Sequence, residues 1–583
     1  MSDLLGQLTG RFHRWLLQGS RRSHMGWLFA LALLLIATGL GLRDPWPADE
    51  PRYALVAKEM VDTGQWLFPH VAGVLYPDKP PLFFWLQAIF YGIFGSVRWT
   101  FLLPSLLASL GTLYLVYDLG RRLWREHIGV IAALLLLASM QFVLQGRQGQ
   151  IDATVCFWIT LGMYGLLRHL LLGPQWRWYV TGFAAMGAGI ITKGVGFLPV
   201  LVLLPWGLVL YRGWRLPRLE GSISRWVSGP VAMLAVIALW LVPMLYVVMT
   251  SDAPDMVAYR NDILLKQTAE RYADSWHHLE PFWYYFTNVI PLFWFPLSLM
   301  LPWLVPAWQR RVKRGDARYV LLLGWVVLVL LFFSVSPGKR GVYILPALPM
   351  LALAAAPLLP GLLRKPSLQR TLFWAGALFN MVLLAALIYF TWLRPEQAFK
   401  LATRLGEATP WLLVGTMAGG GLFSLLACLR RPIIGVAAFL AWFWLVYGLM
   451  VGPMLNPMRS PAAMMTEVRE RAGDSVLGLV GWKEQMALHA DRPFVHFGFR
   501  RDHAMEKRDA LIWVSQGDDR VLLLGSEELP GCVIGGKTRD LGIRHRQHWW
   551  LVEKGDLEAN CRSNLDGQQP KRLFHVDHLS PYR

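Results

Sequence analysis

Two adjacent carboxylates are the residues of this sequence best suited to chemistry. Asp49 and Glu50 follow an apolar run and precede Arg52 and Tyr53. Carboxylates beside Arg and Tyr suit general acid/base catalysis or the binding of a metal ion. The structural alternative is that Asp49 and Glu50 only cap a helix at a membrane surface, because acidic residues favour a helix N-terminus. These residues alone leave both interpretations open.

Three further polar insertions interrupt apolar runs. They are Gln150-Ile151-Asp152, Thr192-Lys193-Gly194 and the stretch from Ser336 to Tyr343. One anionic ligand such as a lipid phosphate would explain both Lys193 and Lys339, because several cations are needed to hold it at an interface. Asp152 could instead cap the helix that it begins, and the two lysines could extend toward lipid headgroups.

The composition indicates which elements position these residues. The chain has 583 residues, of which 55% are hydrophobic and only 16% charged, so it is too apolar for a soluble protein of several domains. The net charge of +19 is compatible with nucleic-acid binding or with membrane orientation. The basic residues form short clusters between apolar runs, which favours a polytopic α-helical membrane protein.

Thirteen apolar runs are candidate membrane spans, since a helix needs about 20 apolar residues to cross a bilayer. The first, 26–42, follows four arginines and lacks a small-residue cleavage site. We therefore expect a retained span with residues 1–24 in the cytoplasm. The other runs are 101–120, 128–146, 151–171, 178–192, 195–211, 228–250, 286–308, 318–335, 341–360, 371–393, 410–429 and 433–452.

The basic clusters set the orientation of these spans. With thirteen spans, every cluster falls in a cytoplasmic loop, as membrane proteins prefer. If the short aromatic run at 82–94 also crossed the membrane, the later basic clusters would lie outside. We therefore expect this run to be a re-entrant or interfacial helix. The transmembrane domain is then 25–452, with outer segments at 43–100 and 251–285. The polar insertions all lie on this outer face.

Residues 453–583 differ in composition and periodicity and predict a soluble periplasmic α/β domain. The expected strands are 476–480, 494–499, 510–514, 521–524 and 549–552. Cys156 and Cys428 lie in apolar segments, so only Cys532 and Cys561 are candidates for a disulfide, in an oxidising compartment. The sequence has no GxxxxGK[ST] loop, which argues against an ATP-driven pump.

One set of residues, spread over roughly residues 25–360, forms a recognisable pattern. Its members are Ala48 to Ala54, Glu59-Met60, Gly64-Gln65-Trp66, Pro69-His70, Gly73, Tyr76, Lys79-Pro80, Trp85, Phe94-Gly95, Asp152, Thr192-Lys193-Gly194, Arg271, His278, Pro281 to Tyr285, Phe333-Ser334, Lys339 and Tyr343 to Pro346. This pattern resembles the signature of the aminoarabinose lipid A transferases, within the wider superfamily that includes protein O-mannosyltransferases.

This resemblance implies a GT-C type membrane glycosyltransferase of the bacterial inner membrane. It would move a sugar from undecaprenyl phosphate to lipid A, another envelope glycan or a protein on the periplasmic side. Asp49 would be the main catalytic carboxylate, with Asp152 and Glu50 as further acidic residues. The residues expected to hold the carrier phosphate are Arg52, Lys79, Lys193, Arg271, Lys339 and Tyr343. Fixed cations and a phenol stabilise the charge that develops on the departing phosphate.

Two positions depart from the pattern of the aminoarabinose enzymes. Asp78 stands where they usually carry Glu, and Lys339-Arg340-Gly341 stands where they usually carry Lys-Leu-Pro. No cofactor is required, although Asp78 and His278 could contribute to a divalent-cation site; two ligands are an incomplete set. A transporter or flippase of lipid-linked sugars is the alternative function, but no inverted repeat supports it.

Overall fold

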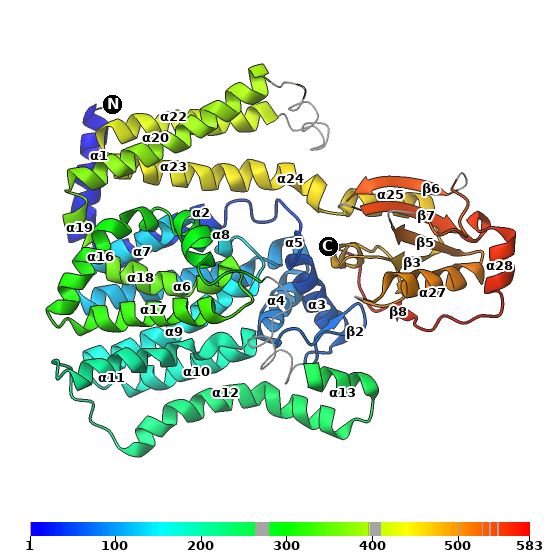
Figure 1. The fold of residues 1–583 in the computed structure, drawn as a ribbon, viewed down its shortest axis with the longest axis horizontal. Coiled ribbons are helices and arrows are strands. Elements are labelled where there is room, and N and C mark those ends of the chain that lie inside the picture. Colours follow the sequence, from blue (N-terminus) through cyan, green and yellow to red (C-terminus); the bar gives the residue numbers. More distant parts are fainter. Residues whose placement is uncertain are drawn as a thin grey trace.

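The computed structural model has a helical body and, at one end of it, a smaller part that contains a β-sheet (Figure 1). It describes residues 2–262, 279–393, 396, 410–499, 501–526, 529–535, 538–544 and 547–582. Arg271 and His278, both predicted site residues, lie outside these described residues.

The helical body is built mainly from apolar helices. Its elements are α1 (Ser2–Gln18), α2 (Arg21–Ile36), α6 (Leu103–Leu123), α7 (Glu126–Ala138), α8 (Met140–Gly146), α9 (Ile151–Leu172), α10 (Trp176–Lys193), η1 (Val195–Val202), α11 (Leu203–Tyr211), α12 (Ile223–Thr250), η3 (Tyr285–Val289), α15 (Ile290–Phe293), α16 (Leu297–Lys313), α17 (Ala317–Val335), α18 (Ala347–Ala355), α19 (Leu359–Leu362), α20 (Pro366–Ile388), η5 (Tyr389–Leu393), α22 (Pro410–Arg430), α23 (Pro432–Val446), η6 (Tyr447–Val451) and α24 (Gly452–Arg459).

Among the described residues, six helices are long and apolar enough to cross a membrane, or up to eight if each of two bent pairs forms one span. The predicted number of thirteen membrane spans is therefore not confirmed, because several of the predicted apolar runs are divided into two helices. The chain bends by 73° between α7 and α8 and by 109° between α15 and α16. The predicted run 195–211 is divided into η1 and α11. A multi-pass membrane protein is nevertheless the architecture that these helices define.

The first outer segment carries most of the predicted site residues. It contains α3 (Glu50–Thr63), β1 (His70–Val71), β2 (Val74–Leu75), α4 (Leu82–Phe94) and α5 (Val97–Thr100). Pro51 lies in the first turn of α3, and Gly64 ends that helix with a φ of 73°, a conformation that glycine adopts without strain. With 13 residues, α4 is too short to cross a bilayer.

Two further short helices lie in the connections between spans. They are α13 (Pro254–Asn261) and η4 (Gly341–Ile344).

The C-terminal part contains a six-stranded mixed sheet of order β6-β7-β5-β3-β4-β8, in which β3 runs parallel to β4 and β5. Its strands are β3 (Val476–Val480), β4 (Phe494–His496), β5 (Arg520–Gly525), β6 (Arg539–Arg544), β7 (Gln547–Glu553) and β8 (Phe574–Val576). Its helices are α25 (Ala462–Ala472), α26 (Glu484–Leu488), α27 (His503–Ser515), η7 (Lys554–Asp556) and α28 (Ala559–Leu565).

One predicted strand of this part is wrong. Residues 510–514 lie in α27, whose first turn is capped by Asp502, because the carboxylate of Asp502 accepts from the N–H groups of Ala504 and Met505. All five residues of the apolar run are buried in this helix, and four of them, Ala510, Leu511, Trp513 and Val514, pack in a core that includes residues of the sheet. A short apolar run does not by itself distinguish a strand from a buried helical face.

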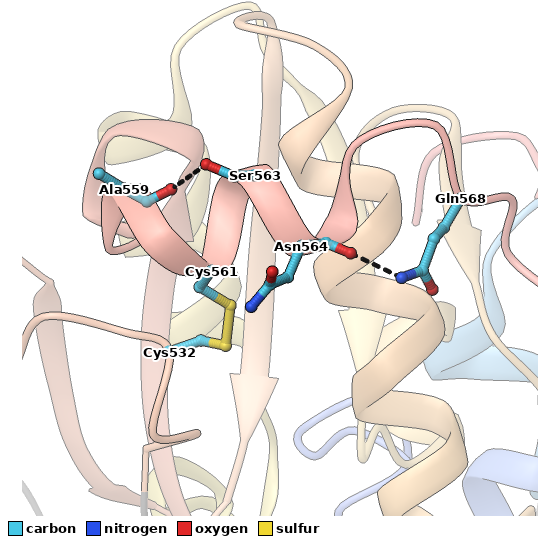
Figure 2. The surroundings of a disulfide bond; sticks show 6 residues. All are labelled: Cys532, Ala559, Cys561, Ser563, Asn564 and Gln568. Carbon is cyan, nitrogen blue, oxygen red and sulfur yellow. Dashed lines mark hydrogen bonds between the residues drawn. A yellow bond between two sulfur atoms is a disulfide. The ribbon is translucent and has the colours of Figure 1, made fainter.

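The predicted disulfide is confirmed. Cys532 and Cys561 are bonded, with their Cα atoms 5.6 Å apart, and the bond ties the connection after β5 to α28 (Figure 2). Among the described cysteines, Cys156 is free and buried in the helical body.

Candidate active site

Asp49 occupies the position before α3 but does not act as its cap. Its side chain makes no capping hydrogen bond. Instead, Oδ2 accepts from Nη2 of Arg340 at 3.0 Å, and Oδ1 lies 3.9 Å from Nη1 of Arg52. The carboxylate is only 14% exposed. One cation therefore bonds this acid and a second lies nearby, which favours the functional interpretation over the capping one.

Glu50 has different surroundings. Arg43 donates to its two oxygens at 2.5 and 2.8 Å, and the backbone N–H groups of Trp46 and Gly149 donate at 2.8 and 2.9 Å. Glu50 is 4% exposed. This fully bonded carboxylate joins the first outer segment to the residues just before α9, so it positions its neighbour Asp49.

Asp152 and Lys193 form an ion pair that joins two spans. Asp152 lies in the first turn of α9, whose capping residue is Gln150, and Lys193 is the last residue of α10. The Lys193 ammonium also lies 4.7 Å from the ring centre of Tyr343 in η4. Asp152 therefore does not simply cap α9, and Lys193 does not extend toward lipid headgroups.

Arg340 connects these two groups. Burial lowers its pKa, but Asp49 and then Asp152 and Tyr343 more than offset this effect, so its pKa lies above the usual range. The pKa of Tyr53 is also raised, mainly by burial and further by Asp49 and Asp152. Both acids therefore lie within electrostatic range of the same arginine and tyrosine. The predicted residues Asp49, Arg52, Asp152, Lys193 and Tyr343 are thus brought into one cluster.

Lys339 does not point into this cluster. Its ammonium donates to the backbone carbonyls of Glu280 at 2.7 Å, Ser336 at 2.6 Å and Pro337 at 3.5 Å, and the residue is 4% exposed. These bonds tie the 336–343 stretch to the second outer segment. The neighbouring Arg340 was missed as a site residue, although the sequence departs from the resembling family at this very position.

Lys79 and Asp78 follow β2 in the first outer segment. Lys79 is buried, and its ammonium donates to the carbonyl of Asp78 at 2.9 Å. Tyr76 of the same loop lies with its ring centre 6.0 Å from the Arg52 guanidinium. No group of three or more metal-binding side chains occurs within the described part of the chain, and the predicted ligand His278 lies outside it.

The C-terminal part also reaches this cluster. Nε of Arg52 donates to Oε1 of Glu484, the first residue of α26, at 2.5 Å. The chain then returns to α3 at residues 577–582. Nζ of Lys58 donates to the carbonyl of Ser580 at 2.5 Å, and the hydroxyl of Tyr582 donates to Asp44 at 2.9 Å. Elements from both ends of the sequence therefore hold α3.

The cluster suits reactions at a charged group in an interfacial site. It combines one carboxylate oxygen without a close donor, an acid–lysine pair and several cations. Such an arrangement can orient an acceptor and stabilise a departing phosphate.

Two solved structures share the fold of this multi-span chain. The crystal structure of ArnT from Cupriavidus metallidurans bound to undecaprenyl phosphate superposes with a TM-score of 0.69 at 19% identity, over 94% of this chain and 100% of the other. Its apo structure gives the same TM-score at 20% identity, over 91% and 99% of the two chains. Residues 78–246 match the family described as dolichyl-phosphate-mannose-protein mannosyltransferase.

Sequence similarity identifies the family. The undecaprenyl phosphate-alpha-4-amino-4-deoxy-L-arabinose arabinosyl transferase 1 of Pseudomonas fluorescens is 34% identical over 447 residues, which cover 73% of this chain and 76% of the relative. The corresponding enzyme of Pseudomonas aeruginosa is 32% identical over 451 residues, with the same coverage. The chain belongs to this family of arabinosyl transferases. The predicted resemblance is confirmed, and a glycosyltransferase is supported over a transporter.

Proposed function

We propose that this enzyme transfers 4-amino-4-deoxy-L-arabinose from undecaprenyl phosphate to an envelope acceptor such as lipid A. The names of the relatives supply the sugar and the carrier. The observation that carries the proposal for this chain is the Asp49 carboxylate, which is bonded to Arg340, lies 3.9 Å from Arg52, and is placed beside the pair of Asp152 and Lys193.

The residues have distinct roles in this proposal. Asp49 takes the proton of an acceptor hydroxyl, or orients an acceptor phosphate that is already ionised. Arg340, Lys193 and Tyr343 stabilise the carrier phosphate as it departs, together with Lys79 and Arg271. Glu50 and Lys339, whose polar atoms are bonded to protein groups, position the two outer segments instead of contacting the substrates.

We propose direct displacement with inversion. The acceptor oxygen forms a bond to the anomeric carbon, while the bond from that carbon to the phosphate oxygen breaks and the phosphate leaves with the electron pair. Asp49 receives the hydroxyl proton when the acceptor is an alcohol. The configuration of the product, measured by nuclear magnetic resonance, tests this step, and retention would contradict it.

Replacement of Asp49 by Asn tests the function. The amide keeps the size of the side chain but cannot accept the proton, so we expect turnover to fall by a factor of about 10² or more. Binding of undecaprenyl phosphate should persist. Asp255→Asn, on an exposed residue of the second outer segment, is the matched control and should keep wild-type turnover. Unchanged turnover in Asp49→Asn would contradict the proposal.

The proposal includes the predicted topology. Residues 1–24 are cytoplasmic, thirteen spans lie within 25–452, and the outer segments and the α/β domain 453–583 are periplasmic. The disulfide between Cys532 and Cys561 supports this orientation, because disulfides persist in oxidising compartments. Labelling of single surface cysteines with a membrane-impermeant thiol reagent tests it.

The proposed reaction requires no cofactor. A divalent cation held by Asp78 and His278 remains a prediction, and transfer assays with and without EDTA test whether a metal is needed.

A further inference from the structure

Arg52 lies between two carboxylates from different parts of the molecule. Its Nε donates to Glu484 at 2.5 Å, whereas its Nη1 is 3.9 Å from Oδ1 of Asp49, which is beyond hydrogen-bond distance. The arginine is thus closely paired with the C-terminal residue and only loosely with the catalytic one. Burial lowers the pKa of Arg52, but Glu484 and Tyr76 together more than offset this effect, so the pKa lies above the usual range.

This arrangement leaves one oxygen of Asp49 available. Oδ2 already accepts from Arg340, and among the described residues no donor lies within hydrogen-bond distance of Oδ1. A bond from a cation occupies a lone pair of a carboxylate oxygen and lowers its basicity, so an oxygen without such a bond takes a proton from an acceptor more readily. An arginine can bind both oxygens of a carboxylate, and Arg52 lies close enough to close on Asp49 after a small movement.

Glu484 is well anchored for this purpose. It begins α26, and both the residue and the rest of that short helix are buried. His496, on the neighbouring strand β4, bonds to the carbonyl of Ala72 at 2.8 Å and so fixes the sheet against the first outer segment. The Glu484 carboxylate therefore has a fixed position relative to α3.

We propose that Glu484 is a positioning residue of the transferase, which holds Arg52 away from Oδ1 of Asp49 so that this oxygen can receive the acceptor. Through this contact the C-terminal part completes the active site. The inference rests on the proposed function, because it assigns the free oxygen to the acceptor.

A double-mutant cycle on the full-length enzyme tests the inference. Transfer is measured from undecaprenyl-phosphate-linked 4-amino-4-deoxy-L-arabinose to lipid A in detergent. We expect Glu484→Gln to lower kcat at least about tenfold while the donor KM changes less than about threefold, since the donor site is intact. In the Arg52→Gln background, Glu484→Gln should cause no further loss, because the arginine that would occupy Asp49 is absent.

The control removes a different contact between the same two regions. Tyr582→Phe deletes the hydrogen bond to Asp44 and should leave kcat within about twofold of wild type. Should Glu484→Gln not yield folded protein, Glu484→Asp replaces it, with a smaller but measurable loss of kcat.

Three results would overturn the inference: wild-type kcat in Glu484→Gln, an equal loss in the Arg52→Gln background, or an equal loss in Tyr582→Phe. Absence of transfer by the wild-type enzyme with this donor would refute the proposed function as well, so the two failures are distinguishable.

Discussion

At the scale of single residues, side chains that are neighbours in the sequence have different roles in the site. Asp49 and Glu50 are adjacent, yet one carboxylate keeps an oxygen without a close donor while the other is bonded by Arg43 and two backbone N–H groups. Lys339 and Arg340 show the same division, since the lysine binds carbonyls and the arginine binds Asp49. The three-dimensional partners decide which of two ionisable neighbours is available for chemistry.

Arg340 provides a prediction at this scale. Arg340→Leu restores the residue that the aminoarabinose enzymes usually carry and removes the 3.0 Å bond to Asp49. We expect transfer to fall roughly 10- to 100-fold, because Asp49 loses the cation that fixes its Oδ2 and the departing phosphate loses a positive charge. Arg340→Lys should lose less. Transfer assays on the two variants give the comparison, and an Arg340→Leu enzyme as active as wild type would exclude a role in the reaction.

At the scale of elements, two histidines hold the turn between β1 and β2. His496 donates from Nε2 to the carbonyl of Ala72, because its Nδ1 accepts from the N–H of Gly498. Glu59 accepts from the N–H groups of Ala72 and Gly73 and bonds to His578 at 2.9 Å. A neutral His496 is therefore part of the packing between the sheet and the first outer segment.

This geometry predicts an acid-sensitive contact. Burial lowers the pKa of His496 to about 4, so between pH 6.5 and 4 the unfolded chain binds a proton that the folded chain excludes. Its contribution to stability is thus lost as the pH falls, by about 2.5 kcal/mol at pH 4.5. The bond of His578 to Glu59 raises the pKa of His578, so the contribution of this histidine to stability is lost as the pH rises.

Thermal unfolding of the detergent-purified protein at pH 7 and pH 4.5 measures the effect. His496→Gln keeps a donor for the Ala72 carbonyl but does not titrate, so it should lose less stability on acidification than wild type. Equal losses in both proteins would contradict the assignment to His496.

Sequence reasoning located many of these elements because local patterns specify them. The apolar runs correspond to helices, the Asp49 and Asp152 insertions lie at helix starts, and the two candidate cysteines are bonded. It failed where tertiary contacts decide. Residues 510–514 form a continuous apolar run because all five are buried in the folded domain, and Arg340 and Glu484 gain their importance only from partners far away in the sequence. No local pattern encodes such contacts without knowledge of the fold.

At the scale of the whole molecule, the C-terminal part is joined to the first outer segment by several buried or partly buried contacts. Glu484 binds Arg52, His496 binds Ala72, and Ser580 binds both Lys58 and Asp62. The two regions lie at the same end of the helical body (Figure 1). The C-terminal part therefore supports the helix that follows Asp49, the proposed catalytic carboxylate.

Deletion of residues 456–583 tests this dependence. We expect transfer to fall at least about tenfold, because α3 loses the partners of Arg52, Lys58 and Asp62, while binding of undecaprenyl phosphate to the helical body is retained. Deletion from residue 577 onward, which spares the sheet, should cause a smaller loss. Size-exclusion chromatography checks that both proteins remain monodisperse, and full activity of the larger deletion would show that the domain is dispensable.

The contact between Ser580 and Asp62 joins residues that are 518 positions apart in the chain. The first outer segment is synthesised early, but its final neighbours emerge from the ribosome only after hundreds of later residues have been inserted or translocated. During that interval α3 has no native covering on this side. Assembly of the proposed catalytic centre is therefore a late event in biogenesis, and a chain whose synthesis stops early carries Asp49 without the surroundings that orient it.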